Sequence, residues 1–234
     1  MVELNTAGER TLILFAKEPK PGTVKTRLGP LLTPKQSAAV AEAFLRDSAA
    51  LVREAEVERR VVSYAPVGSE ESMRARLGEG FVFEPQAEGD LGLRLRVAFD
   101  RALTSANARV VAIGADAPTL PPEVLAEAFD ALERHDVVIG PALDLGYYLI
   151  GLRRPLPELF VDLKWGTAEV LPTTLARLRC AQVGVHLLPP WYDVDTPDEL
   201  AFLRAHIDGL SLDGRRPVPK ATTAVLEQFR QLFP

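Results

Sequence analysis

Short apolar runs alternate with stretches of helical periodicity along most of the chain. The runs TLILFA at 11–16 and RVVAIG at 109–114 have the length and the β-branched content of buried strands. After the first run, the signature of a capped helix start is formed by Thr33, Pro34 and Gln36. Apolar residues then recur at helical spacing. Strands that alternate with helices predict βαβ units and a mostly parallel sheet.

The same patterns predict further strands at 57–65, 81–85, 136–142, 147–152 and 183–188. They also predict helices at 70–77, from Asp90, from Pro121, at 167–179 and behind the capping box of Thr196 and Glu199. The strands at 136–142 and 147–152 are too close in sequence for a crossover helix, so one strand of that region is expected to be antiparallel. The predicted fold class is therefore α/β, with a mixed sheet and helices on both faces.

The 234 residues fit one large α/β domain. An apolar fraction of 47% and a charged fraction of 25% are ordinary for a globular protein. We expect a single domain over 1–234, with a core at about 11–208 and a C-terminal extension at 209–234. The segment 210–234 reads as a polar loop and a terminal helix, packed on the domain or on a second subunit, which would make a homodimer.

The charge pattern narrows the class of partner. The net charge is −5 and no long Lys/Arg run is present, which argues against nucleic acid and anionic membranes. Cys180 is the only cysteine, so the fold cannot depend on an internal disulfide. The N-terminus lacks the apolar core of a signal peptide and no apolar run is long enough to span a bilayer, so we expect a cytoplasmic protein.

The loop behind the first strand carries a candidate phosphate site. Ligands of open α/β sheets bind outside the carboxyl ends of the strands. The sequence AKEPKPGTVKTRLG brings Lys17, Lys20, Lys25 and Arg27 to that end of the first strand. Free backbone N–H groups together with Lys and Arg suit a diphosphate. The spacing matches neither a P-loop nor GxGxxG, and a basic surface loop would show the same pattern.

Two aspartates are candidate ligands of Mg²⁺ or Mn²⁺. Asp116 directly follows the strand at 109–114, where a carboxylate would face the ligand crevice. Asp195 lies with Asp193 in the sequence DVDTP, and these two acidic residues just before a predicted helix could supply a second ligand. Each has a structural alternative. Asp116 could cap the turn before Pro121, and Asp195 could lie at the start of the helix because the helix dipole favours a negative charge there. The pair strengthens the metal interpretation, because sites for hard cations draw carboxylates from separate elements.

Two further clusters are candidates with equally plain alternatives. QAEGDLG at 86–92 has glycines that let a nucleotide approach the backbone, or it is a turn with an N-cap at Asp90. An acceptor pocket could use an aromatic wall and a carboxylate base, from Asp144, Tyr147, Lys164, Trp165 and Thr167. Tyr148 and Trp165 could equally be core residues. The histidines show no metal-binding spacing, His186 in a strand reads as structural, and no Ser-His-Asp or zinc motif appears.

Six segments in order resemble the bacterial DUF2064 family: LILFAKEPKPGTVKTRL, QAEGDLGLRL, AIGADAPTLP, GPALDLGYYLIGL, LKWGTAEVL and DVDTPDEL. That family is also described as a glycosyltransferase family associated with radical-SAM and arsenosugar gene clusters. It belongs to the nucleotide-diphospho-sugar transferase superfamily, so the resemblance, over about 11–208, implies the GT-A fold. The segments VKTRLGPLLTPKQ, Asp-x-Pro and DVDTPDEL also resemble 2-phospho-lactate guanylyltransferase, although its Gly-Thr-Asn signature is absent.

The resemblance implies roles for individual residues. The first loop would cradle the nucleotide phosphates through Lys17, Lys25 and Arg27, while Asp116 and Asp195 would bind the metal. The full set of candidate nucleotide-binding residues is Ala16, Lys17, Gly22, Lys25, Arg27, Gln86, Gly89 and Asp116. The family usually reads Asp-Gly-Gly-Tyr where this chain has Asp144-Leu145-Gly146-Tyr147, and leucine reaches positive φ less easily than glycine. The shape of this turn therefore bears on any acceptor contact by Asp144.

Three functions are consistent with these features. The first is metal-dependent transfer of a sugar from a nucleotide-diphospho-sugar to a small acceptor, with Lys25, Arg27 and Asp144 as catalytic candidates. The second is nucleotidyl transfer from a nucleoside triphosphate, which releases pyrophosphate and would use the same metal and cations. The third is a nucleotide-binding protein without catalysis. The expected cofactor is Mg²⁺ or Mn²⁺, and the expected partners are a nucleotide or nucleotide-sugar and a small-molecule acceptor.

Overall fold

The computed structural model describes residues 9–214 and 217–232. Within them the chain forms a seven-stranded sheet in the order β3-β2-β1-β4-β6-β5-β7. The strands are β1 (Arg10–Lys17), β2 (Arg59–Ala65), β3 (Val82–Pro85), β4 (Arg109–Gly114), β5 (Val137–Pro141), β6 (Tyr147–Leu152) and β7 (Val185–Leu187). The N-terminal sequence that we interpreted as lacking a signal peptide lies mostly outside the described residues.

Only β6 runs against its neighbours in this sheet. It pairs antiparallel with both β4 and β5, while the other neighbouring pairs are parallel. The short β5–β6 connection requires this reversal, because a parallel pair would need a long crossover. The predicted mixed, mostly parallel sheet is confirmed, and so is the antiparallel strand.

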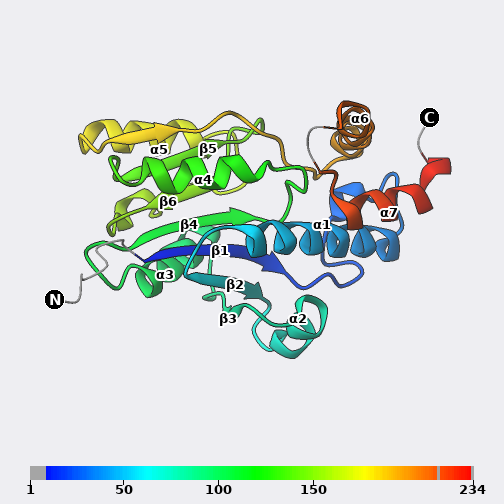
Figure 1. Cartoon of the computed structure of the whole chain (residues 1–234), viewed down its shortest axis with the longest axis horizontal. Coiled ribbons are helices and arrows are strands. Elements are labelled where there is room, and N and C mark those ends of the chain that lie inside the picture. The colour runs from blue at the N-terminus through cyan, green and yellow to red at the C-terminus, as the bar shows by residue number, and fades with distance from the viewer. Residues whose placement is uncertain (1–8, 215–216, 233–234) are drawn as a thin grey trace.

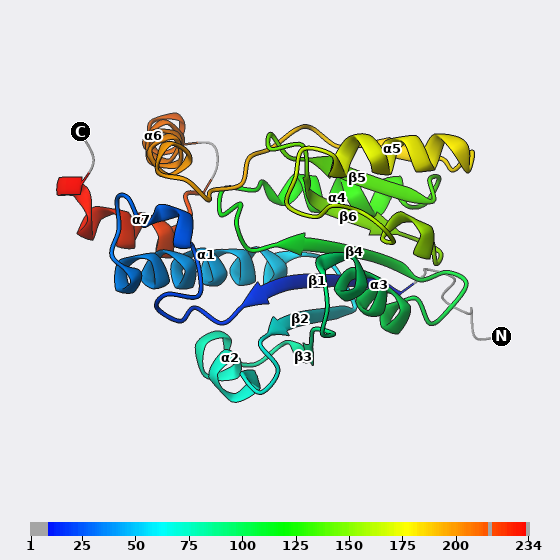
Figure 2. The same ribbon diagram turned by 180° about the vertical axis from the view of Figure 1, so that it is seen from behind.

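The helices are α1 (Pro34–Glu54), α2 (Glu70–Leu77), α3 (Leu91–Ala102), α4 (Pro122–Ala131), α5 (Val170–Cys180), α6 (Pro197–Asp213) and α7 (Lys220–Gln228). Short 3₁₀ turns lie at η1 (Thr26–Leu28), η2 (Pro157–Leu159) and η3 (Arg230–Leu232). Helices α1 and α4 cover one face of the sheet and α3 and α5 the other, while α6 and α7 lie beyond the end to which β1 points (Figures 1 and 2). No helix among the described residues is long and apolar enough to cross a membrane.

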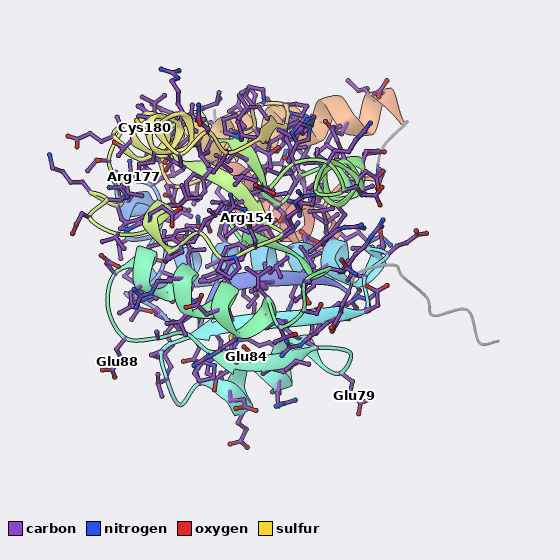
Figure 3. The ribbon with its side chains drawn as sticks, turned by 90° about the vertical axis from the view of Figure 1, so that its left-hand side faces the viewer. Glu79, Glu84, Glu88, Arg154, Arg177 and Cys180 are labelled. Atoms are coloured by element: carbon purple, nitrogen blue, oxygen red, sulfur yellow. The ribbon has the colours of Figure 1, made fainter. Side chains whose placement is uncertain are left out.

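The strands bury both faces, which explains their continuous apolar runs. In β1, Leu12 and Leu14 pack in the core beneath α1 and α4, while Ile13 packs in the core on the α3 side. Figure 3 looks along the molecule from one end and shows the two edges of the sheet. Arg177 and Cys180 of α5 lie at one edge, and Glu79 and Glu84 lie near β3 at the other.

A third core joins the C-terminal helices to α1. Phe44 of α1 shares this core with Leu203 of α6 and Val225 of α7. The backbone N–H groups of Ala221 and Thr222, at the start of α7, donate to the carboxylate of Asp47 at 3.0 and 2.7 Å. The terminal helix therefore packs on its own chain, which is one of the two arrangements that the sequence left open.

Several predicted boundaries need correction. The polar loop expected from residue 210 is wrong for 210–213, because α6 continues until Gly214 ends it with a φ of 67°. The helix expected from Thr167 starts at Val170, since the Thr167 hydroxyl donates to the Lys164 carbonyl at 2.7 Å and closes a turn there. The strand predicted at 183–188 is shorter, at Val185–Leu187.

Gly92 gives a test of how closely α3 packs. A Cβ atom at Gly92 would lie 2.2 Å from the Phe160 carbonyl oxygen and 2.6 Å from Trp165 Nε1, whereas one at Gly209 of α6 would meet nothing within 4 Å. We expect Gly92→Ala to lower the free energy of unfolding by about 1–3 kcal/mol, the usual cost of overpacking. Gly209→Ala should raise it by roughly 0.5–1 kcal/mol, because alanine favours helix. Urea unfolding of both variants checks this, and equal effects would contradict it.

Candidate active site

The order of the strands places a crevice between β1 and β4. Chain connections leave β1 toward β2 on one side, while β4 lies on its other side, and ligands of such sheets bind where the order reverses. The loops that follow β1 and β4 in the sequence both open at this crevice. Because β6 is antiparallel, its first residue, Tyr147, also lies at this edge.

The segment between β7 and α6 crosses this edge of the sheet and reaches the loop that follows β4. Trp191 N donates to the Pro141 carbonyl at 3.0 Å, next to a bridge between Ala142 and Trp191. Val194 N then donates to the Asp116 carbonyl at 3.0 Å. These bonds carry Asp195, just ahead of α6, to the side of Asp116, which is far from it in sequence.

The loops enclose a cavity of about 390 Å³. The side chains that line it come from β1, the β1–α1 loop, α1, α3, the β4–α4 loop, β6 and the β7–α6 segment. Those with chemical groups of interest are Lys17, Lys25, Asp116, Tyr147, Asp193 and Asp195. The volume suits a small ligand, and the charged groups are concentrated at one place in the wall.

The Lys25 ammonium group lies between the two predicted metal ligands. Its Nζ is 2.6 Å from Asp116 Oδ1 and 2.8 Å from Asp195 Oδ1. It also donates to the Val194 carbonyl at 2.7 Å. The structure therefore brings Asp116, Asp195 and Lys25 together, and a cation bridges the carboxylates.

Burial and the neighbouring carboxylates act on Lys25 in opposite directions. The Lys25 side chain is 5% exposed, and its Nζ lies 5.4 Å from the centre of the Phe44 ring. Burial alone would lower the pKa of the Lys25 ammonium, but the charges of Asp116 and Asp195 and the hydrogen bonds to them raise the pKa above its ordinary value. Lys25 therefore stays charged within the protein.

The other cations of the first loop have different surroundings. Arg27 is 68% exposed, with its Nη1 3.6 Å from Asp195 Oδ2, so it borders the site from the solvent side. Lys17 Nζ donates to the Thr23 carbonyl at 2.7 Å and holds the loop in shape. Lys20 pairs with Glu18 at 2.7 Å. Arg27 is thus accessible to an incoming anion.

Asp193 is the other acidic residue of DVDTP, which the sequence offered together with Asp195 as a source of a second metal ligand. It lines the cavity, and burial raises the pKa of its carboxyl to about 7. The charges of Asp116 and Asp144 add to the rise, and Lys25 opposes it. Asp193 and Asp195 are two residues apart in the sequence, but only the fold shows that Asp193 is partly buried.

Four of the predicted nucleotide-binding residues do not line this cavity, although the structure describes them. They are Ala16, Gly22, Gln86 and Gly89. Gln86 Nε2 donates to the carbonyls of Ser63 at 2.8 Å and Ala16 at 3.3 Å, which ties the ends of β1, β2 and β3 together. Asp90 caps α3 by accepting from Leu93 N at 2.8 Å, as in the plainer interpretation of this segment.

The β5–β6 turn keeps a glycine-like shape in spite of Leu145. Leu145 has a φ of 67°, and Gly146 N donates to Asp144 Oδ1 at 2.8 Å. The Asp144 carboxylate therefore stabilises its own turn and does not line the cavity, although its charge is felt at Asp193. The leucine departs from the family pattern without changing the left-handed turn.

The aromatic cluster beside this turn is partly core. Tyr148 is buried and its hydroxyl donates to the Pro189 carbonyl at 2.9 Å. Tyr147 packs edge-on against Trp165 with ring centres 6.0 Å apart, and the Tyr147 hydroxyl and the Trp165 indole N–H are buried without a protein partner. Lys164 instead pairs with Glu169 at 3.1 Å.

The histidines do not take part in this site. His186 Nε2 lies 2.8 Å from Glu127 Oε1, and its ring lies 5.6 Å from that of His135. His206 Nδ1 lies 2.7 Å from the Tyr192 hydroxyl. None of the three lines the cavity.

The residues present suit a divalent ion that receives most of its ligands from phosphate oxygens and water. Over the part of the chain that the structure describes, no group of three or more His, Cys, Asp or Glu side chains is arranged to hold a metal. Asp116 and Asp195 nevertheless share one cation, the Lys25 ammonium, and are 51% and 42% exposed. Mg²⁺ is typically held by one or two carboxylates together with phosphate oxygens and water, which fits this pair.

Comparison with known proteins supports the fold. The sequence profile of DUF2064, described as "Uncharacterized protein conserved in bacteria", matches residues 48–167. A structure from Desulfovibrio desulfuricans G20, described provisionally as a nucleotide-diphospho-sugar transferase, is 34% identical with a TM-score of 0.87 over 96% of each chain. No curated protein matches the chain.

Two more distant structures share the fold alone. One is Rv0371c of Mycobacterium tuberculosis H37Rv in complex with manganese, 19% identical with a TM-score of 0.50, over 82% of this chain and 96% of that one. The other is the inositol-1-phosphate CTP transferase from T. maritima, 14% identical with a TM-score of 0.53, over 82% of this chain and 91% of that one. The fold is therefore that of nucleotide-diphospho-sugar transferases.

The left-handed Leu145 provides a test of the β5–β6 turn. A left-handed backbone costs a non-glycine residue roughly 1–2 kcal/mol. Glycine would remove this cost, but part of the gain is lost because glycine raises the conformational entropy of the unfolded chain. We expect Leu145→Gly to raise the free energy of unfolding by up to about 1 kcal/mol. Leu143→Gly, at an exposed position of the same turn whose φ is not positive, should lower it instead. Urea midpoints compare the two, and a loss of stability in Leu145→Gly would refute the strain.

Proposed function

The chain belongs to the DUF2064 family of bacterial proteins, and from this and its active-site geometry we propose that it is a metal-dependent glycosyltransferase. It would move a sugar from a nucleotide-diphospho-sugar to a small acceptor. The donor's bond between the sugar carbon and the diphosphate oxygen breaks, a bond to an acceptor oxygen forms, and the nucleoside diphosphate leaves.

One observation carries the proposal. Asp116, Asp195 and Lys25 meet at the cavity outside the carboxyl ends of β1 and β4. Carboxylates from two separate elements that converge on a cation at this position suit a hard metal ion bound to a diphosphate.

The chain's own residues have distinct parts in this proposal. Asp116 and Asp195 would hold Mg²⁺ or Mn²⁺, which supplies positive charge that stabilises a leaving diphosphate. Lys25 and Arg27 would add positive charge on the protein side of the same group. Asp144, beside the cavity, would orient the acceptor hydroxyl or accept its proton, with Tyr147 and Trp165 as an apolar wall.

Nucleotidyl transfer is the second candidate, and a specific likeness favours it. The T. maritima structure that shares the fold is named as a CTP transferase. In this reaction an acceptor phosphate or carboxylate oxygen attacks the α-phosphorus of a nucleoside triphosphate and pyrophosphate leaves. The same aspartates and cations would serve, so the leaving group is what separates the two reactions. A nucleotide-binding protein without turnover is the third candidate.

Phosphorus NMR separates these candidates. We expect release of nucleoside diphosphate when nucleotide-diphospho-sugars and acceptors are supplied with Mn²⁺, because the sugar–oxygen bond is the one that breaks. Release of pyrophosphate from a nucleoside triphosphate would instead establish nucleotidyl transfer. Nucleotide binding with no turnover of any donor would establish the third candidate and refute both enzymes.

Replacing the aspartates tests the proposed metal pair. A nucleotide at 100 times its Kd should stabilise the wild type by about 2.7 kcal/mol in the presence of Mn²⁺. We expect Asp116→Ala and Asp195→Ala to lose most of this stabilisation in a thermal-shift assay, because the ion that joins protein and phosphate has lost a ligand. Asp100→Ala, an exposed aspartate on α3, is the matched control and should keep it. Full stabilisation in both site variants would rule out the metal pair.

A further inference from the structure

The Lys25 ammonium occupies the position that the divalent ion is proposed to take. We propose that Lys25 holds the cation site in the absence of nucleotide and is drawn onto the nucleotide phosphates on binding, so the metal enters with the nucleotide and not before it. This inference rests on the proposed function, since it describes how the same site is loaded.

The oxygens at this position use all three hydrogens of the ammonium. Its three hydrogens are matched by three acceptors, Asp116 Oδ1, Asp195 Oδ1 and the Val194 carbonyl, at 2.6–2.8 Å. These are hard oxygen atoms of the kind that bind Mg²⁺ or Mn²⁺. The lysine therefore satisfies the same acceptors that a metal ion would need.

The two cations cannot share these oxygens comfortably. Metal–oxygen distances are about 2.1 Å for Mg²⁺, so an ion bound to both carboxylates would lie within a few ångströms of Nζ. In a partly buried site the repulsion between like charges is weakly screened. Metal binding to the free protein would therefore have to expel the ammonium from its three acceptors, at a large cost.

A bound phosphate removes that cost because it offers Lys25 a new anionic partner. Lys25 lines the cavity together with Lys17 and lies on the loop in which a diphosphate is expected to bind. Arg27, exposed on the solvent side of Asp195, could begin to attract such an anion before Lys25 moves. The half-exposed carboxylates then remain accessible to an ion that arrives with the phosphate.

The backbone at Lys25 is compatible with such a movement. Its φ of 47° and ψ of 38° lie in the left-handed region, which is unfavourable for a residue with a Cβ atom. The residue lies directly before η1, between Gly22, whose φ is 79°, and the buried Leu28. The ion pair helps to keep Lys25 in this conformation, so losing it to phosphate also permits the backbone to relax.

Binding of Mn²⁺ alone to the full-length protein tests the exchange without any measurement of activity. We expect Lys25→Met, which keeps the length of the side chain but not its charge, to bind Mn²⁺ at least tenfold more tightly than the wild type in electron paramagnetic resonance titrations. Lys20→Met is the matched control, because it removes a lysine charge from the same loop at a residue that pairs with Glu18. Its Mn²⁺ affinity should equal that of the wild type.

The double variant Lys25→Met/Asp116→Asn locates the gain. It should return the Mn²⁺ affinity to the wild-type value or below, because one carboxylate of the opened site is gone. If Lys25→Met unfolds, as repulsion between Asp116 and Asp195 would favour, Lys25→Gln retains two donors for the same carboxylates and should show the same direction of change. Folded protein is verified by its thermal unfolding in each case.

An unchanged or weaker Mn²⁺ affinity in folded Lys25→Met or Lys25→Gln would overturn the exchange and leave Lys25 as a permanent partner of the carboxylates. This outcome is distinct from failure of the proposed function. If the variant gains Mn²⁺ affinity and the wild type binds nucleotide with Mn²⁺ but turns over no donor, the exchange stands and the transferase proposal fails. If the wild type is a Mn²⁺-dependent transferase but the variant gains nothing, only the exchange fails.

Discussion

One buried ammonium group organises the candidate site. Lys25 Nζ bonds to Asp116, Asp195 and the Val194 carbonyl, and so joins the β1–α1 loop, the β4–α4 loop and the segment before α6. These three elements come from distant parts of the chain. Without a cation between them, two carboxylates and the neighbouring Asp193 would repel one another in a partly buried place. The site's geometry depends on that charge balance, whichever cation supplies it.

The sheet topology makes this meeting inevitable. The strand order reverses between β1 and β4, so their carboxyl ends open into one crevice. The antiparallel β6 brings Tyr147 to the same edge, and hydrogen bonds from Trp191 and Val194 lead the chain across the edge from β5 to β4. The capping box of Thr196 and Glu199 starts α6 immediately after Asp195 in the sequence. Local helix chemistry thus fixes where the second carboxylate lies.

The sequence predicted the frame well and the site in outline. Apolar runs and capping boxes located the strands and most helices, because both signals are local. The rule that ligands bind at strand ends singled out Asp116, and the structure brings it to Asp195 and Lys25, although their roles remain predictions. The cations of the first loop and the resemblance to DUF2064 assigned Lys25 to phosphates, and neither could show that its side chain turns back to the carboxylates. The sequence also missed the partial burial of Asp193 and the length of α6, which depend on long-range packing.

The proposed function requires Asp116 and Asp195 to bind a divalent ion together with a nucleoside diphosphate. This is tested by anomalous X-ray scattering from crystals grown with Mn²⁺ and a nucleoside diphosphate. We expect one Mn²⁺ peak bonded to both carboxylates and to a phosphate oxygen, with Lys25 Nζ displaced from them. A nucleotide bound in the cavity with no Mn²⁺ peak at these carboxylates, or with the ion held elsewhere, would contradict it.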